Sequence, residues 1–245
     1  MATSRLLIEY DGTDFAGWAR QPGQRTVEGV LEAAIARVTR REDVRLTVAG
    51  RTDTGVHALG QVASHDGEPA YAGALNGVLP RDVRVIESEL APEAFDARRD
   101  ALSRTYRYRL HTRVAQSPFE RGRSLHWPHR VDSRALQQAA RAIVGTHDFS
   151  AFTPTQTKHI LFTRTVLRAE WLPPADADPH VLEFWIEAET FMRHMVRILV
   201  GTMLEVGGGR RSQEDFRRLL TGRPRHEAGD TAAAHGLYLE SVRYR

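Results

Sequence analysis

Apolar and polar residues alternate in several stretches of the first hundred residues and recur at helical spacing between them. The alternation of RLLIEY (residues 5–10) predicts a strand, as do VRLTVA, GQVASHD and VRVIESEL further along. Apolar residues at helical spacing predict a helix over 26–39 with Thr26 as N-cap, and a shorter helix is predicted near Ala70–Gly77. The resulting order is β-α-β-β-α-β, which is the ferredoxin-like order.

The second half of the chain repeats this order of elements without repeating residues. RTYRYRL, TRTVLRAEWL, VLEFWIEAE and GLYLESVRYR are predicted strands. Helices are predicted from an N-cap at Asp132 or Ser133 to Val144, over 191–206, and through SQEDFRRLL, and the GGG at 207–209 is interpreted as a helix C-cap. We therefore predict an α+β protein of two ferredoxin-like (βαββαβ) domains, residues 1–100 and 101–245, with mainly antiparallel sheets flanking a central cleft.

Composition excludes several kinds of chemistry. The 245 residues include no cysteine, so disulfides, thiolate metal sites and cysteine nucleophiles are excluded, and a nucleophile must be oxygen or nitrogen. No window approaches the roughly 18 apolar residues of a membrane span, and the first five residues show no signal core. The sequence predicts a cytoplasmic protein that does not enter the membrane.

Arginine dominates the basic residues. The formal net charge is +3 and Lys158 is the single lysine of the chain. A GC-rich genome is one explanation for this choice of residue, but it does not account for the clustering, which indicates a polyanionic partner. The clusters are Arg98–Arg99, Arg104–Arg109, Arg121–Arg123, Arg193–Arg197 and Arg210–Arg211.

The stretch GRTDTGVHA (residues 50–58) places one carboxylate, Asp53, between two glycines. Gly50 and Gly55 allow a sharp loop, and Arg51 lies where a guanidinium–carboxylate pair would hold Asp53 ionised for nucleophilic work. Two alternatives remain at this point. T-D-T-G is ordinary turn chemistry, and Asp-Thr-Gly is also the aspartic-protease triplet, although the chain holds no second DTG or DSG to share a proton.

Six islands of sequence carry a resemblance to a known family. AGRTDTGVHALGQVASHD, YDGTDFAGW, FDARRDALSRTYRYRL, HDFSAF, HMVRILVG and GLYL together resemble the tRNA pseudouridine synthase A (TruA) family. The resemblance implies isomerisation of uridine to pseudouridine in the anticodon stem-loop of tRNA, at tRNA positions 38–40. It also implies a homodimer that binds tRNA in the central cleft and needs no cofactor or metal.

The same resemblance implies roles for individual residues. Asp53 is the expected catalytic carboxylate, which attacks the sugar or the base or assists a glycal route, and Arg51 is expected to pair with it and hold the flipped nucleotide. Tyr106 is expected to stack on the uracil and assist proton removal from C5. Leu237 is expected to line the uracil pocket. For both Tyr106 and Leu237 the alternative is a strand residue packed in the core.

Residues 191–206 are predicted to form a helix with a basic face. Arg193, His194 and Arg197 would lie near one another there and bind phosphates, although a merely solvated charged face is the alternative. The chain also departs from the family pattern, with Ala19 where glutamine usually follows GW, Asp96 within FDAR, and Ile198 after HMVR. These departures leave the tRNA contacts open, and a catalytically silent tRNA-binding protein remains the second candidate.

Overall fold

The computed structural model describes residues 2–157, 159–173 and 178–245, which divide into two compact units. The first unit comprises the chain up to Arg104 together with Tyr238–Arg245, and the second unit comprises Thr105–Leu237. Both combine helices with mostly antiparallel strand pairs, so the predicted α+β class is confirmed. None of the helices in the described ranges has the length and apolarity needed to cross a membrane.

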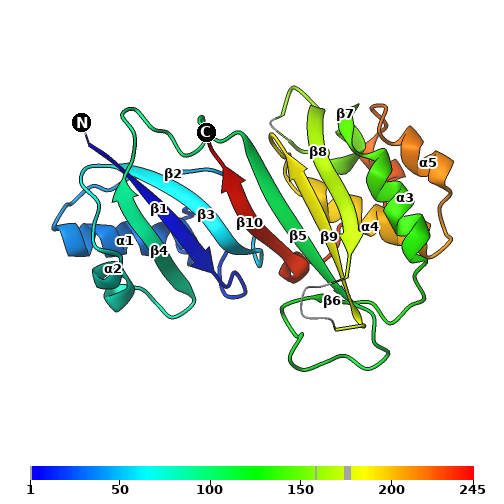
Figure 1. The fold of residues 1–245 in the computed structure, drawn as a ribbon, viewed down its shortest axis with the longest axis horizontal. Coiled ribbons are helices and arrows are strands. Elements are labelled where there is room, and N and C mark those ends of the chain that lie inside the picture. The colour runs from blue at the N-terminus through cyan, green and yellow to red at the C-terminus, as the bar shows by residue number, and fades with distance from the viewer. Residues whose placement is uncertain (1, 158, 174–177) are drawn as a thin grey trace. The chain divides into compact units, whose positions relative to one another are not determined.

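In the first unit two helices pack behind a sheet (Figure 1). Strands follow one another in the order β4-β1-β3-β10; β1 pairs antiparallel with β3 and β4, while β10 runs parallel to β3. The short strand β2 also pairs with β3. The elements are β1 (Thr3–Tyr10), α1 (Val27–Thr39), β2 (Thr47–Val48), β3 (His57–Asp66), α2 (Ala72–Val78), β4 (Val83–Leu90) and β10 (Leu237–Arg243).

Local sequence explains most of these elements. Every second residue of β1 is buried, as its alternation predicts, and the hydroxyl of Thr26 caps α1 by accepting from the backbone N of Gly29. The strand predicted over 44–49 is wrong in length, since β2 comprises only Thr47 and Val48. The backbone N of Ala49 still donates to the carbonyl of Val62 in β3 at 2.9 Å, and before β2 the backbone N of Leu46 donates to the Glu32 carboxylate of α1 at 3.3 Å.

The second unit contains a further set of strands in the order β5-β9-β8-β7, with β6 paired to β5. The predicted strands over 163–172 and 181–189 are confirmed, whereas β6 and β7 were not predicted. The bounds are β5 (Ser103–His111), β6 (Leu125–His126), α3 (Ser133–Ala142), β7 (Gly145–Asp148), η1 (Ser150–Phe152), β8 (Thr163–Leu172), β9 (Val181–Ala188), α4 (Met195–Gly207), α5 (Gln213–Arg218), η2 (Arg225–Glu227) and η3 (Ala234–Gly236).

Helix α4 begins four residues later than predicted. His194 has a φ of 60°, which lies in the left-handed region and outside helical geometry. The helix therefore begins at Met195, whose backbone N donates to the carbonyl of Met192 at 3.2 Å in a preceding turn. Arg193 and His194 therefore precede the helix, and Arg197 lies in its first turn. The C-cap interpretation of the glycines is confirmed, because α4 ends at Gly207 and Gly209 has a φ of 72°.

Candidate active site

The loop between β2 and β3 presents Asp53 at the start of a tight turn. The backbone N of Val56 donates to the carbonyl of Asp53 at 3.1 Å, and Gly55 has a φ of 77°, which the turn requires. Asp53 is half-buried and Arg51 is exposed. The T-D-T-G segment therefore forms a turn, as its residues predict, and this turn fixes the position of Asp53 on the loop. Pairing between Arg51 and Asp53 stays a prediction.

A second glycine-containing loop, residues 11–18, packs tightly against this turn. A β-carbon on Gly12 would lie 2.0 Å from the carbonyl oxygen of Val56, and one on Gly17, whose φ is 90°, would lie 2.9 Å from the carbonyl oxygen of Thr52. Trp18 donates its backbone N–H to that same Thr52 carbonyl at 3.0 Å. Because these two glycines have no side chain, the backbone of residues 11–18 contacts the backbone of the Asp53 loop on both sides of Asp53.

A buried hydrogen-bond network supports the Asp53 loop from the sheet. The hydroxyls of Tyr10 and Thr52 are 2.7 Å apart, and Gln61 Nε2 donates to the Tyr10 hydroxyl at 3.3 Å and to the Gly50 carbonyl at 2.8 Å. Burial raises the pKa of Tyr10 to about 12, so this hydroxyl keeps its proton at neutral pH. The network fixes Gly50 and Thr52, the residues on both sides of Arg51.

Sequence reasoning missed this supporting network. The available signals were the glycines of YDGTDFAGW and a glutamine, Gln61, at a buried position of β3. The partners of that glutamine lie 51 and 11 residues away along the chain, and no local pattern connects them.

Replacing Gly12 with alanine should destabilise the first unit because the added methyl group meets the Val56 carbonyl at an impossible distance. We expect a loss of about 1–3 kcal/mol in the free energy of unfolding, measured by urea denaturation. Gly77→Ala is the matched control, since nothing lies within 4 Å of its added β-carbon. That variant should be neutral or up to about 1 kcal/mol more stable, and equal losses in both variants would contradict the close approach.

Tyr106 and Leu237 belong to the second unit and are both buried. Tyr106 is 8% exposed and contacts the edge of Phe191, with ring centroids 5.0 Å apart. Two residues further along β5, the Tyr108 hydroxyl donates to the carbonyl of Ala233 at 2.8 Å. Gly236 lies against the Tyr108 ring, where its missing β-carbon would sit 2.8 Å away. Tyr108 therefore holds the segment that leads directly into Leu237.

The three predicted phosphate ligands have different surroundings. Arg193 is exposed, and its carbonyl accepts from the Thr153 hydroxyl at 3.3 Å. Arg197 is half-buried, and its Nε donates to the carbonyl of Ala232 at 2.7 Å. Arg197 thus holds the segment that leads to Leu237. The predicted basic helix face over residues 193–197 is wrong, because Arg193 and His194 precede α4.

In the described ranges no group of three or more His, Cys, Asp or Glu is arranged to hold a metal ion.

Several clustered arginines are engaged within the protein. Arg104 is 6% exposed and donates from Nε and Nη2 to the carbonyl of Ala49 at 3.0 and 2.7 Å. Arg107 pairs with Glu183 at 2.7 Å. Arg104 and Arg107 are therefore engaged in contacts within the protein. The exposed members of the clusters are Arg98, Arg99, Arg121, Arg123, Arg193 and Arg210.

The structure thus shows Asp53 as a half-buried carboxylate on a loop that the neighbouring backbone contacts on both sides, in a chain without thiols. Comparison with known proteins places the chain in a family. The family described as tRNA pseudouridine synthase matches residues 6–89 and 139–245. This chain therefore belongs to the tRNA pseudouridine synthase family, and the resemblance carried by the six islands is confirmed.

Relatives align over nearly the whole chain. The tRNA pseudouridine synthase A of Bacillus pumilus is 39% identical over 98% of this chain and 98% of its own length. That of Frankia casuarinae is 47% identical over 98% of this chain and 88% of its own length. A solved Cbf5–Nop10–Gar1 complex covers 82% of this chain and 54% of its own at 15% identity and a TM-score of 0.34, a likeness too weak to support an argument.

Proposed function

We propose that this chain isomerises uridine to pseudouridine in tRNA, at positions 38–40 of the anticodon stem-loop. The glycosidic bond between N1 and the sugar breaks, the base turns while it is held, and a bond forms from C5 to the same sugar carbon. C5 loses its proton and N1 gains one, so the product is an isomer and no co-reactant is consumed. The observation that carries the proposal is the match to the family over residues 6–89 and 139–245. Asp53 is our candidate for the catalytic carboxylate, which the GRTDTGVHA motif predicts and whose loop is held from two sides by close backbone contacts.

Four of the predicted site residues have proposed roles at the target nucleotide. Asp53 acts on the sugar or the base, or assists a glycal route, and its half-buried position limits competition from water. Arg51, exposed beside it, pairs with the carboxylate and holds the flipped nucleotide. Tyr106 stacks on the uracil and takes part in proton transfer at C5, and Leu237 forms an apolar wall that keeps water from the cleaved base.

The finer architecture belongs to the same proposal. The strand order of the first unit, with β2 beyond β3 and β4 beyond β1, supports a ferredoxin-like domain at residues 1–100, and we assign the same class to residues 101–245. The first domain carries the Asp53 loop and the second supplies the uracil pocket and tRNA contacts. We further propose a cytoplasmic homodimer, on the strength of the family alone.

The direct test is an assay of the purified protein on unmodified tRNA. Carbodiimide labelling followed by primer extension detects pseudouridine, which intact-mass measurement misses because the isomer has the same mass as uridine. We expect new stops within the anticodon stem-loop. Binding of tRNA without any labelled base would support the catalytically silent protein instead, and would defeat the proposal.

Removing the exposed Arg193 should make tRNA binding less sensitive to salt. Each phosphate neutralised contributes a slope of about −0.7 to −0.9 to the plot of log binding constant against log salt, so Arg193→Ala should flatten the slope by nearly one such contribution. Arg37→Ala, an exposed arginine of α1 outside the clusters, is the control. An unchanged slope in Arg193→Ala would make this residue an ordinary solvated side chain. Arg197 is unsuitable for this test because its loss would also break the bond to Ala232.

A further inference from the structure

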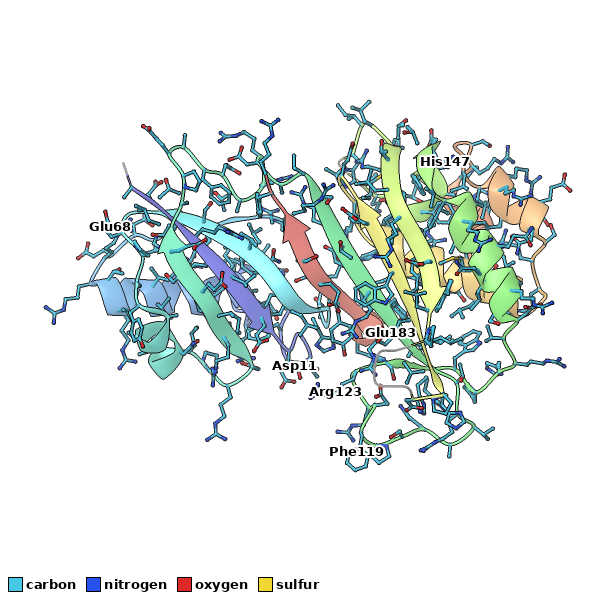
Figure 2. All side chains as sticks on the ribbon, viewed as in Figure 1. Asp11, Glu68, Phe119, Arg123, His147 and Glu183 are labelled. Atoms are coloured by element: carbon cyan, nitrogen blue, oxygen red, sulfur yellow. The ribbon has the colours of Figure 1, made fainter. Side chains whose placement is uncertain are left out.

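The loop between β5 and β6, residues 112–124, carries an aromatic side chain that the fold leaves almost wholly exposed. Phe119 is 88% exposed, and Figure 2 shows it at the outer edge of this loop. Leaving a phenylalanine in water forgoes about 1.5–3 kcal/mol of burial free energy. Single exposed apolar residues are common on protein surfaces, so the inference rests on how the loop holds this one and on what surrounds it.

The residue that follows Phe119 anchors the loop. The Glu120 carboxylate accepts from Arg109 of β5 at 3.3 Å, with both side chains mostly buried. The Glu120 carbonyl accepts from the backbone N of Arg123 at 3.0 Å and of Ser124 at 3.2 Å. Because its neighbour is fixed on two sides, Phe119 is presented outward by a folded loop and is not the end of a loose segment.

The charge of the loop is positive on its outer side. Arg113, Arg121 and Arg123 are all exposed, and Glu120, the one acidic residue between 112 and 124, turns its carboxylate to Arg109. A loop that carries an exposed aromatic ring and several exposed arginines has the combination that binds single-stranded nucleic acid, since bases stack on the ring while phosphates contact the cations.

We infer that Phe119 stacks on an unpaired base of the tRNA substrate, with Arg121 and Arg123 at the neighbouring phosphates. The inference rests on the proposed function for the identity of the RNA. The base is not the target uridine, because the proposed function places that uridine at Tyr106, which is 8% exposed, whereas Phe119 is 88% exposed. The contact is thus a second point at which the enzyme holds its substrate, and it needs no pairing partner in the RNA.

Substitutions of Phe119 test the inference by separating affinity from chemistry. Phe119→Ala and Phe119→Leu should each weaken tRNA binding by roughly 5- to 100-fold, the loss of one base–aromatic stack, while Phe119→Trp should bind within about threefold of the wild type because it keeps an aromatic face. The salt slope should not change, because no charge is removed. Single-turnover rates at saturating tRNA should also stay near those of the wild type. Tyr71→Ala is the matched control, since Tyr71 is 80% exposed in a segment, 66–80, without arginine or lysine.

The possible outcomes distinguish this inference from the function on which it rests. Wild-type affinity in Phe119→Ala, with pseudouridine still formed, would overturn the stacking contact and leave the proposed function intact. A wild type that forms no pseudouridine, yet binds tRNA in a manner dependent on Phe119, would support the contact and defeat the proposed function. A change of sedimentation in Phe119→Ala at unchanged tRNA affinity would make Phe119 a protein–protein contact and overturn the inference.

Discussion

Asp53→Asn should lose pseudouridine formation almost completely, with a fall of at least about 10³-fold in the single-turnover rate. Asparagine keeps the size of the side chain and its place in the turn, but its amide is a poor nucleophile and a poor base. The affinity for tRNA should stay within a few-fold of the wild type, because phosphate contacts provide most of it. Filter binding and carbodiimide labelling on the same preparation measure the two quantities.

The matched control for Asp53→Asn is Asp14→Asn. Asp14 is an exposed carboxylate on the neighbouring loop that braces the Asp53 turn, so its replacement removes the same charge from the same region. The control should react at the wild-type rate. Retention of even a few per cent of the single-turnover rate in Asp53→Asn would remove Asp53 from the role of nucleophile, and an equal loss in both variants would indicate a long-range electrostatic effect.

Elements whose pattern is local were predictable from the sequence. The strands β4 and β8 were predicted with their observed bounds from the residue pattern of each segment, and α1 was placed by its N-cap, Thr26. Prediction failed where the bounds of an element depend on the backbone conformation of one residue or on a partner far away in the sequence. The φ of His194 delays α4, and β2 ends before Ala49, whose carbonyl accepts from the guanidinium of Arg104.

The candidate site likewise has a part that a local motif predicts and a part that depends on residues far apart in the sequence. The motif GRTDTGVHA was sufficient to single out Asp53, but the parts that position its loop lie far apart in the chain: Tyr10 is 42 residues from Thr52 and 51 from Gln61. The sequence also could not separate the exposed arginines of the clusters from those engaged within the protein. The guanidinium of Arg104 donates to the carbonyl of Ala49, which lies 55 residues away along the chain. No local pattern in the sequence indicates that contact.

Tyr106→Phe should bind tRNA as the wild type does and yet convert it at a rate lower by about 10²–10⁴-fold, the usual contribution of a positioned acid or base. The phenylalanine ring keeps the stacking face and the edge contact to Phe191, so only the hydroxyl is lost. The reaction should stall after glycosidic cleavage, because rearomatising the turned base requires loss of the proton on C5. Rapid-quench analysis of a single turnover would show that intermediate accumulating.

Tyr108→Phe is the control that separates catalysis from folding. Its ring lies two residues along the same strand, and its hydroxyl donates to the Ala233 carbonyl. The loss of that bond should cost about 1 kcal/mol of stability and leave the chemical step near the wild-type rate. Tyr106→Leu is less informative, because Tyr106 is buried and the smaller side chain would lower stability as well as stacking. If Tyr106→Phe instead turns over as fast as the wild type while Tyr106→Leu unfolds at a much lower temperature, Tyr106 is a core strand residue and the proton at C5 must leave through another group.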